Sequence, residues 1–283
     1  MALQTIDVRP VAGALGAEVF GADLSQDLSN RAHDEIHRAF LDHQVLFIRD
    51  QTLTPAQHAA FARRFGPLNI YPFVEAIEGE PEIIEIVKEP DDFKNFGGGW
   101  HSDSSYLDQP PLGTALYALE APDIGGDTMY ADMYGAYDAL SDGMKAMLGG
   151  LTGICSAALR ASGGRAAGMK KTSAMKAANM DQSDAIVAEH PIVRTHPETG
   201  RKALYLNQAH TIHFKDMTEA ESRPLIDYLC DHAVRPEFTC RFRWQTGTLA
   251  LWDNRCTQHF AINDYHGQRR RMHRATIQGD KPV

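Results

Sequence analysis

The stretch that decides the fold and its interpretation is Gly97-Gly98-Gly99-Trp100-His101-Ser102-Asp103-Ser104-Ser105-Tyr106. His101 and Asp103 are two residues apart. On an extended segment they would point to the same side, because strand side chains alternate faces. An imidazole and a carboxylate are two of the three ligands in the face of two histidines and one carboxylate that binds Fe(II) and leaves coordination positions open. We therefore expect a third ligand from elsewhere in the chain.

Length, composition and charge restrict the class of protein. The chain has 283 residues, 43% of them hydrophobic, and no linker divides it, so we expect a single domain over residues 1–283. The formal net charge of -9 disfavours nucleic acid and anionic membranes, which reward basic surfaces, and favours a small-molecule partner. No apolar run reaches the ~18 residues of a membrane span. The four cysteines lack metal-binding or disulfide spacing, so we expect a cytoplasmic protein with reduced thiols.

Hydrophobic periodicity predicts many short strands with a few helices outside them. Apolar residues recur at helical spacing over residues 30–43, and Thr54 and Pro55 open a second helix that continues through Phe65. Strands are predicted at residues 44–49, 82–87, 113–119, 239–244 and 248–253. Short strands separated by turns, without alternating βα units, predict an α+β fold with a double-stranded β-helix (jelly-roll) core and flanking helices.

One stretch differs in composition from the rest. Residues 156–185 are dominated by Ala, Gly, Ser, Lys and Met. This composition is typical of a solvated, mobile connection. The position between two segments that carry motifs is equally compatible with a lid over a site.

Motifs at both ends of the chain resemble those of one family. The matching segments are Phe65-Gly66-Pro67, Trp100-His101-Ser102-Asp103, Gly125-Gly126-Asp127-Thr128, Thr195-His196-Pro197, Trp252-Asp253-Asn254, Gln258-His259 and Met272-His273-Arg274-Ala275-Thr276. In type and order they resemble the Fe(II)- and 2-oxoglutarate-dependent dioxygenases of the taurine dioxygenase and 2,4-dichlorophenoxyacetate dioxygenase type. The resemblance extends over almost the whole chain.

The resemblance implies a metal centre and a co-substrate site. It makes His101, Asp103 and His259 the Fe(II) ligands. Arg270 matches the arginine that pairs with the distal carboxylate of 2-oxoglutarate, and Thr128 matches a hydroxyl that assists it. An arginine suits this task because its parallel N–H groups meet both carboxylate oxygens. The implied co-substrates are 2-oxoglutarate and O2, and the implied products include succinate and CO2.

The resemblance also implies substrate-binding residues. Arg274 matches an arginine that binds the anionic group of the substrate, and its even offset from Arg270 predicts one shared strand face. Where the taurine enzyme has His, Tyr, Asn and Phe, this chain has Tyr71, Val74, Gly97 and His210. Without these polar partners the amine of taurine would be poorly paired. We therefore expect hydroxylation of another small organic anion, a carboxylate, sulfonate or sulfate ester.

The residues alone are also compatible with two other functions. A zinc hydrolase can use three such ligands and an activated water, although Arg270 and Thr128 would then lack a role. A non-catalytic jelly-roll protein that binds an organic acid would bind it without metal. We also expect a homo-oligomer, either a dimer or a tetramer.

Overall fold

The computed structural model describes residues 4–158 and 176–283. The α-helices are α1 (Asn30–His43), α2 (Pro55–Arg63), α3 (Met133–Asp138), α4 (Asp142–Leu148) and α6 (Glu219–Ala233), and the 3-10 helices are η2 (Met180–Ala185) and η3 (Pro236–Phe238). The strands are β1 (Asp7–Pro10), β2 (Ala17–Phe20), β3 (Val45–Ile48), β4 (Leu68–Asn69), β5 (Ala76–Ile77), β6 (Glu80–Lys88), β7 (Gly113–Glu120), β8 (Thr128–Asp132), β9 (Thr152–Ser156), β10 (Val187–Pro191), β11 (Val193–Thr195), β12 (Lys202–Leu204), β13 (Thr211–Phe214), β14 (Thr239–Phe242), β15 (Leu249–Asp253), β16 (Thr257–Ala261) and β17 (Arg270–Ile277).

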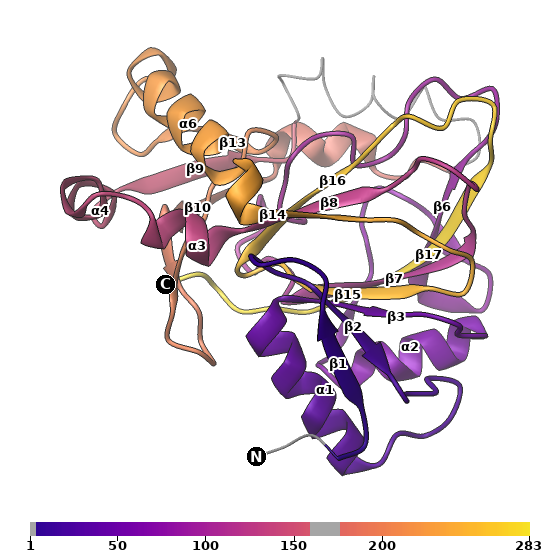
Figure 1. The fold of residues 1–283 in the computed structure, drawn as a ribbon. Coiled ribbons are helices and arrows are strands. Elements are labelled where there is room, and N and C mark those ends of the chain that lie inside the picture. Colours follow the sequence, from indigo (N-terminus) through magenta and orange to yellow (C-terminus); the bar gives the residue numbers. More distant parts are fainter. Residues whose placement is uncertain (1–3, 159–175) are drawn as a thin grey trace.

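Two sheets form the jelly roll (Figure 1). The larger has nine strands in the order β1-β2-β3-β15-β7-β17-β6-β5, with β4 paired to β17. The smaller has the order β14-β8-β16. Neighbours in these sheets come from distant parts of the chain, since β15 lies between β3 and β7 and pairs antiparallel with both. The architecture agrees with the predicted jelly-roll core and flanking helices.

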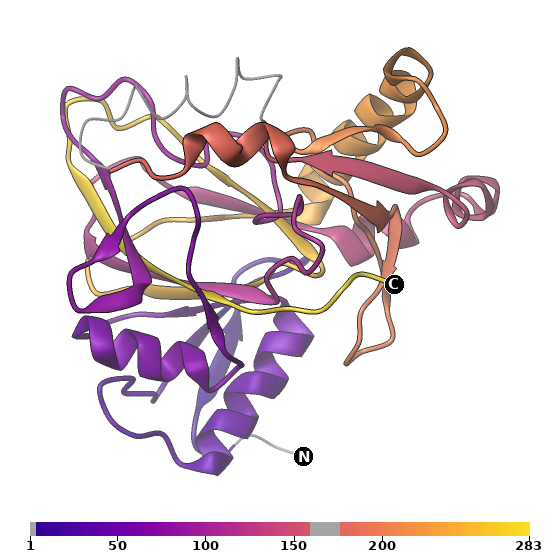
Figure 2. The same cartoon turned by 180° about the vertical axis from the view of Figure 1, so that it is seen from behind.

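The alternation of side chains on β3 separates two cores. Leu46 and Ile48 pack with Phe40 of α1 on the outer face of the large sheet. Val45 and Phe47 point the other way, into the core between the two sheets. Figure 2 shows α1 and α2 together on the outer side of the large sheet. Truncating fully buried Phe40 to alanine should cost about 3–5 kcal/mol of stability.

The second helix ends earlier than its sequence predicts. The side chain of Thr54 accepts from the backbone N–H of Gln57, and the side chain of Gln57 bonds back to the Thr54 backbone, which fixes the start. The helix ends at Arg63 rather than Phe65. The N–H of Phe65 donates to the carbonyl of Ala62, a tighter i−3 bond that closes the last turn.

Most of the stretch predicted as a lid or connection, residues 159–175, lies outside the described residues. Its described end runs beside the segment that carries Val74. Val74 and Ala177 form a bridge, and the N–H of Glu75 donates to the carbonyl of Lys176 at 3.0 Å. The described end of this stretch therefore pairs through its backbone with the segment that carries Val74, one of the predicted substrate residues.

A membrane-spanning helix must be long and apolar. No helix within residues 4–158 and 176–283 combines the length and the apolar character needed to cross a membrane. The longest, α6, has 15 residues and carries acidic residues in its first turn.

Candidate active site

Three of the predicted site residues converge inside the jelly roll. The backbones of His101 and His259 bond to each other in an isolated bridge, with N–H···O distances of 3.1 and 2.9 Å. Oδ1 of Asp103 lies 3.6 Å from Nε2 of His101 and 3.7 Å from Nε2 of His259. All three possible ligand atoms lie within 4.8 Å of one another. One metal ion could contact all three.

The segment around Asp103 is a turn, not the extended segment predicted from the sequence. His101 lies in the bridge, but residues 103–106 form a turn in which Ser104 has a φ of 45°. The N–H of Asp103 donates to Oδ1 of Asn254 at 3.2 Å instead of to a strand neighbour. The bend, rather than strand alternation, directs the Asp103 carboxylate toward the imidazoles.

The donor set fits a divalent cation. Nδ1 of His101 lies 2.7 Å from the carbonyl of Gly99, so we assign the proton to Nδ1, which leaves the Nε2 lone pair for an ion. Burial lowers the pKa of His259 to about 3, so its imidazole is neutral at pH 7. Burial alone would raise the pKa of Asp103, but Arg274 and the two imidazoles outweigh it and hold that pKa well below its usual value. The resulting donor set is the neutral imidazole of His259, the Nε2 lone pair of His101 and one carboxylate.

Arg274 lies directly at this carboxylate. Its Nη2 is 2.9 Å from Oδ1 of Asp103, an ion pair without the angle of a hydrogen bond, and its Nε donates to Oγ1 of Thr276 at 3.2 Å. The other carboxylate oxygen, Oδ2, accepts from Oγ1 of Thr114 at 2.8 Å. A buried cation therefore lies next to the candidate metal centre.

Arg270 forms a second cationic point on the same strand. It is buried, and its Nε and Nη2 have no hydrogen-bond partner among the described residues. Its guanidinium carbon lies 5.5 Å from the centre of the Trp244 ring, and Nε1 of Trp244 donates to Oγ1 of Thr128 at 2.9 Å. Because the Thr128 oxygen accepts this bond, its own O–H can donate elsewhere. A buried guanidinium with unpaired N–H groups is costly alone, and a carboxylate would satisfy it.

The family motifs predict that Arg270 and Thr128 belong to the site, but they do not include Trp244. The only sequence signal at Trp244 was its place in the alternating stretch 239–244. Its contact with Thr128 joins residues far apart in the chain, which a single sequence does not reveal.

The predicted substrate residues on the apolar side lie beside Arg274. The Arg274 guanidinium carbon is 5.5 Å from the centre of the Tyr71 ring. Tyr71 also packs against a small apolar cluster that contains Val74 and Ile84, together with Phe96. The side of the site next to Arg274 is therefore largely apolar.

The remaining two predicted substrate residues lie against His101. A Cβ added to Gly97 would lie 3.4 Å from Cε1 of His101, and Gly97 has a φ of 80°, which disfavours other residues. The ring centre of His210 lies 6.4 Å from that of His101. Arg274, Gly97 and His210 thus neighbour the candidate ligands, whereas Tyr71 lies beside Arg274 and Val74 packs in the cluster that Tyr71 contacts.

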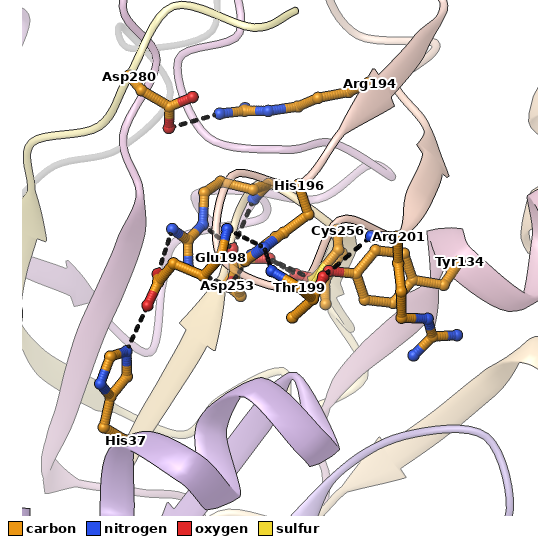
Figure 3. Close-up of polar contacts among 12 residues, drawn as sticks. His37, Tyr134, Arg194, His196, Glu198, Thr199, Arg201, Asp253, Cys256 and Asp280 are labelled. Atoms are coloured by element: carbon orange, nitrogen blue, oxygen red, sulfur yellow. Dashed lines mark hydrogen bonds and ion pairs between the residues drawn. The ribbon is translucent and has the colours of Figure 1, made fainter. Parts of the chain in front are cut away.

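A second cluster, His196, Asp253 and Cys256, also has closely spaced ligand atoms (Figure 3). Nε2 of His196 lies 3.0 Å from Oδ2 of Asp253, while Nδ1 accepts the N–H groups of Glu198 and Thr199. Both imidazole nitrogens are therefore engaged. Burial raises the pKa of the Cys256 thiol well above its usual value, which disfavours the thiolate that a metal requires.

The carboxylate of this cluster is also fully paired. Arg255 donates from Nε to Oδ1 of Asp253 at 2.9 Å and from Nη2 to Oδ2 at 2.7 Å. Glu198 extends the network to Nη1 of Arg255 at 2.7 Å and to Nε2 of His37 on α1 at 2.8 Å. Figure 3 shows the contact between Glu198 and His37 at one end of this network. We conclude that the cluster is a structural ionic network rather than a second metal centre.

Comparisons with known proteins agree with this fold and this site. The model of the "Taurine catabolism dioxygenase TauD, TfdA family" matches residues 7–276. An alpha-ketoglutarate-dependent sulfate ester dioxygenase of Pseudomonas putida is 33% identical, over 98% of this chain and 91% of its own length. An (S)-phenoxypropionate/alpha-ketoglutarate-dioxygenase of Sphingobium herbicidovorans is 34% identical, over 97% of this chain and 95% of its own length. The crystal structure of a taurine dioxygenase from Burkholderia xenovorans has a TM-score of 0.83 and 34% identity, covering 99% of this chain and 91% of that one. The chain therefore belongs to the TauD, TfdA family and is an oxidoreductase, a dioxygenase that uses Fe(II), 2-oxoglutarate and O2.

Proposed function

We propose that this dioxygenase hydroxylates a small organic anion other than taurine: a sulfate ester, a sulfonate or a carboxylate. The observation that carries the proposal is the pair of buried arginines, Arg270 and Arg274, at an even offset on β17. Arg270 lies close to Trp244, which binds Thr128, and Arg274 borders the three candidate ligands. Nε and Nη2 of Arg270 lack a hydrogen-bond partner among the described residues, and a metal ion on Asp103 would leave Arg274 in need of another anion, so the site provides for two anionic molecules.

The first anion is the co-substrate. In this proposal His101, Asp103 and His259 hold Fe(II), which when bound supplies the activation of O2 and the oxidative decarboxylation of 2-oxoglutarate. Arg270 donates its two unpartnered N–H groups to the distal carboxylate, and Thr128 donates its O–H to the same group. These contacts fix the orientation of the co-substrate and compensate the burial of the guanidinium.

The second anion is the substrate. Arg274 binds its anionic group, and the rest of the molecule lies against Tyr71 and Val74. Apolar surface on this side favours an apolar body, and Gly97 leaves room beside His101 where a side chain would stand. The relatives named for sulfate esters and for phenoxypropionate act on anions of this kind. The amine of taurine would lack suitable hydrogen-bond partners on the apolar surface of Tyr71 and Val74.

The test is a substrate panel under defined conditions. Protein purified anaerobically, loaded with Fe(II) and given 2-oxoglutarate and O2, is assayed for substrate-dependent succinate release with sulfate esters, sulfonates including taurine, aryloxyalkanoates and amino-acid-like acids. We expect the highest kcat/KM with an anion that carries an apolar body. Turnover with taurine alone, or with none of these anions, would contradict the proposal.

The ligand assignment has a matched control. Asp103→Ala should abolish turnover, whereas Asp108→Ala, which removes an exposed carboxylate paired with Lys281, should leave it unchanged. Full turnover by Asp103→Ala would refute the assignment. A zinc hydrolase would leave Arg270 and Thr128 without a role, and a non-catalytic acid-binding protein would consume no O2.

We further propose that residues 1–283 form one domain. We also propose that the protein assembles as a dimer or a tetramer and that it works in the cytoplasm. All four cysteines are buried and free, which suits a reducing compartment. Light scattering of the full chain measures the assembly, and a monomer at micromolar concentration would contradict it.

A further inference from the structure

Tyr130 carries a buried hydroxyl that the proposed function leaves unused. The residue is fully buried, and its Oη has no hydrogen-bond partner among the described residues. An unsatisfied buried hydroxyl costs about 1–3 kcal/mol, so such a group usually has a partner. A molecule that binds next to it would supply one.

The position of Tyr130 places this hydroxyl within the site. In the pairing of β8 with β16, Tyr130 stands directly opposite His259, and the two ring centres are 6.2 Å apart. Thr128 precedes it by two residues on the same strand and therefore points to the same face. Burial has the largest effect on the pKa of the phenol, and Cys240, Arg270 and Asp103 are near enough to act on it as well. Tyr130 therefore lies beside His259, on the strand face that also carries Thr128.

The surroundings of the ring leave the hydroxyl available as a donor. Phe47 and Trp252 lie against the ring, with centres 5.7 and 5.8 Å away, and neither offers an acceptor. The O–H of a tyrosine is a hydrogen-bond donor in its ordinary neutral form. A neutral donor beside a buried guanidinium is suited to an anion, because both then contribute hydrogen bonds to it.

We propose that Tyr130 is a further co-substrate-binding residue, whose O–H donates to the distal carboxylate of 2-oxoglutarate alongside Arg270 and Thr128. The inference rests on the proposed co-substrate site. It adds a third donor, from β8, to the two already assigned.

The test compares Tyr130→Phe with the wild type. We expect the Kd of 2-oxoglutarate for the Mn(II)-loaded protein, measured anaerobically by calorimetry, to rise about tenfold, as for the loss of a hydrogen bond to a charged group. The Tm of the protein without co-substrate should stay the same or rise, because the change removes an unpartnered buried hydroxyl. A hydroxyl with a merely structural role predicts the reverse, a lower Tm and an unchanged Kd, and that result would overturn the inference.

Two controls make the result specific. Tyr205 also has a buried hydroxyl, but its ring lies against His190 and Arg194, which the proposed function does not place in the site. Tyr205→Phe should leave the Kd of 2-oxoglutarate unchanged. 2-Oxovalerate lacks the distal carboxylate, so wild type and Tyr130→Phe should bind it equally. A tenfold loss that persists with 2-oxovalerate would refute the contact with that carboxylate.

Failure of this inference can be told apart from failure of the proposed function. An unchanged Kd in Tyr130→Phe, with wild type active on the panel of anions, contradicts only the role of Tyr130. A wild type that binds 2-oxoglutarate but oxidises none of the anions contradicts the proposed substrate class and not the role of Tyr130.

Discussion

Nη2 of Arg274 lies 2.9 Å from Oδ1 of Asp103, the same carboxylate oxygen that faces His101 and His259. The cation proposed to bind the substrate therefore neighbours the ligand proposed to bind the metal. Before an ion binds, the guanidinium compensates the buried carboxylate. A divalent ion would share that carboxylate with Arg274, and the two positive charges would repel each other.

Replacing Arg274 should therefore affect metal and substrate in opposite directions. In Arg274→Met we expect Mn(II) to bind severalfold more tightly, because a competing cation is gone, and the KM of the anionic substrate to rise about 100-fold, as for the loss of a charge-assisted contact. Calorimetry with Mn(II) and initial rates measure the two effects. Arg271→Met is the control, because that side chain pairs with Glu85 instead of Asp103. Weaker metal binding in Arg274→Met would contradict the competition.

A closed set of buried hydrogen bonds holds the carboxylate of Asp103. Oγ1 of Thr114 donates to Oδ2 of Asp103 at 2.8 Å and accepts from Nδ2 of Asn254 at 3.3 Å, and Oδ1 of Asn254 accepts the N–H of Asp103 at 3.2 Å. Oδ2 is thereby engaged, which leaves Oδ1 for the ion.

Loss of the Thr114 hydroxyl should weaken metal binding. We expect Thr114→Val, which keeps the shape of the side chain, to lower Mn(II) affinity about 10- to 100-fold. Thr114→Ser retains the donor and should stay within a few-fold of wild type. Equal affinities of the Val and Ser variants would show that the hydroxyl does not orient Asp103.

The network around Asp253 should matter for stability and not for metal content. Asp253→Asn leaves the buried Arg255 only partly paired, so we expect a loss of about 3 kcal/mol in the free energy of unfolding. The metal content, measured by elemental analysis, should remain one ion per chain. Asp138→Asn, at an exposed ion pair with Arg201, should change stability by less than about 1 kcal/mol. A wild type that holds two ions per chain and an Asp253→Asn variant that holds one would make this cluster a second metal centre.

Acid stability should depend on Glu35. The hydroxyl of Thr5, with the backbone N–H groups of Gln4, Thr5 and Ile6, lowers the pKa of Glu35 from 4.5 to about 2. The pKa of Glu35 is lower in the folded protein than in the unfolded chain. The stabilisation by the ionised carboxylate is therefore complete above about pH 5 and is lost as the pH falls toward 2. The Tm difference between wild type and Glu35→Gln should therefore shrink between pH 6 and pH 3. A constant difference across that range would contradict the assignment.

The sequence by itself determined the local elements and the candidate metal ligands. The apolar spacing over residues 30–43 predicted α1 to the residue, and Thr54 with Pro55 marked the start of α2. The family motifs named His101, Asp103 and His259, and the structure brings their ligand atoms together. These features can be read from the sequence because helix periodicity, capping and short motifs depend on neighbours along the chain.

Only the tertiary structure decided how these residues are oriented and what surrounds them. Asp103 faces the imidazoles through a turn that Asn254 holds. Trp244, which follows β14, and Tyr130 on β8 come close to site residues only in the folded chain. The end of α2 was also misjudged, since the tighter last turn has no sequence marker of its own. Contacts across paired strands depend on register and side-chain direction, and both are set by packing between segments far apart in sequence.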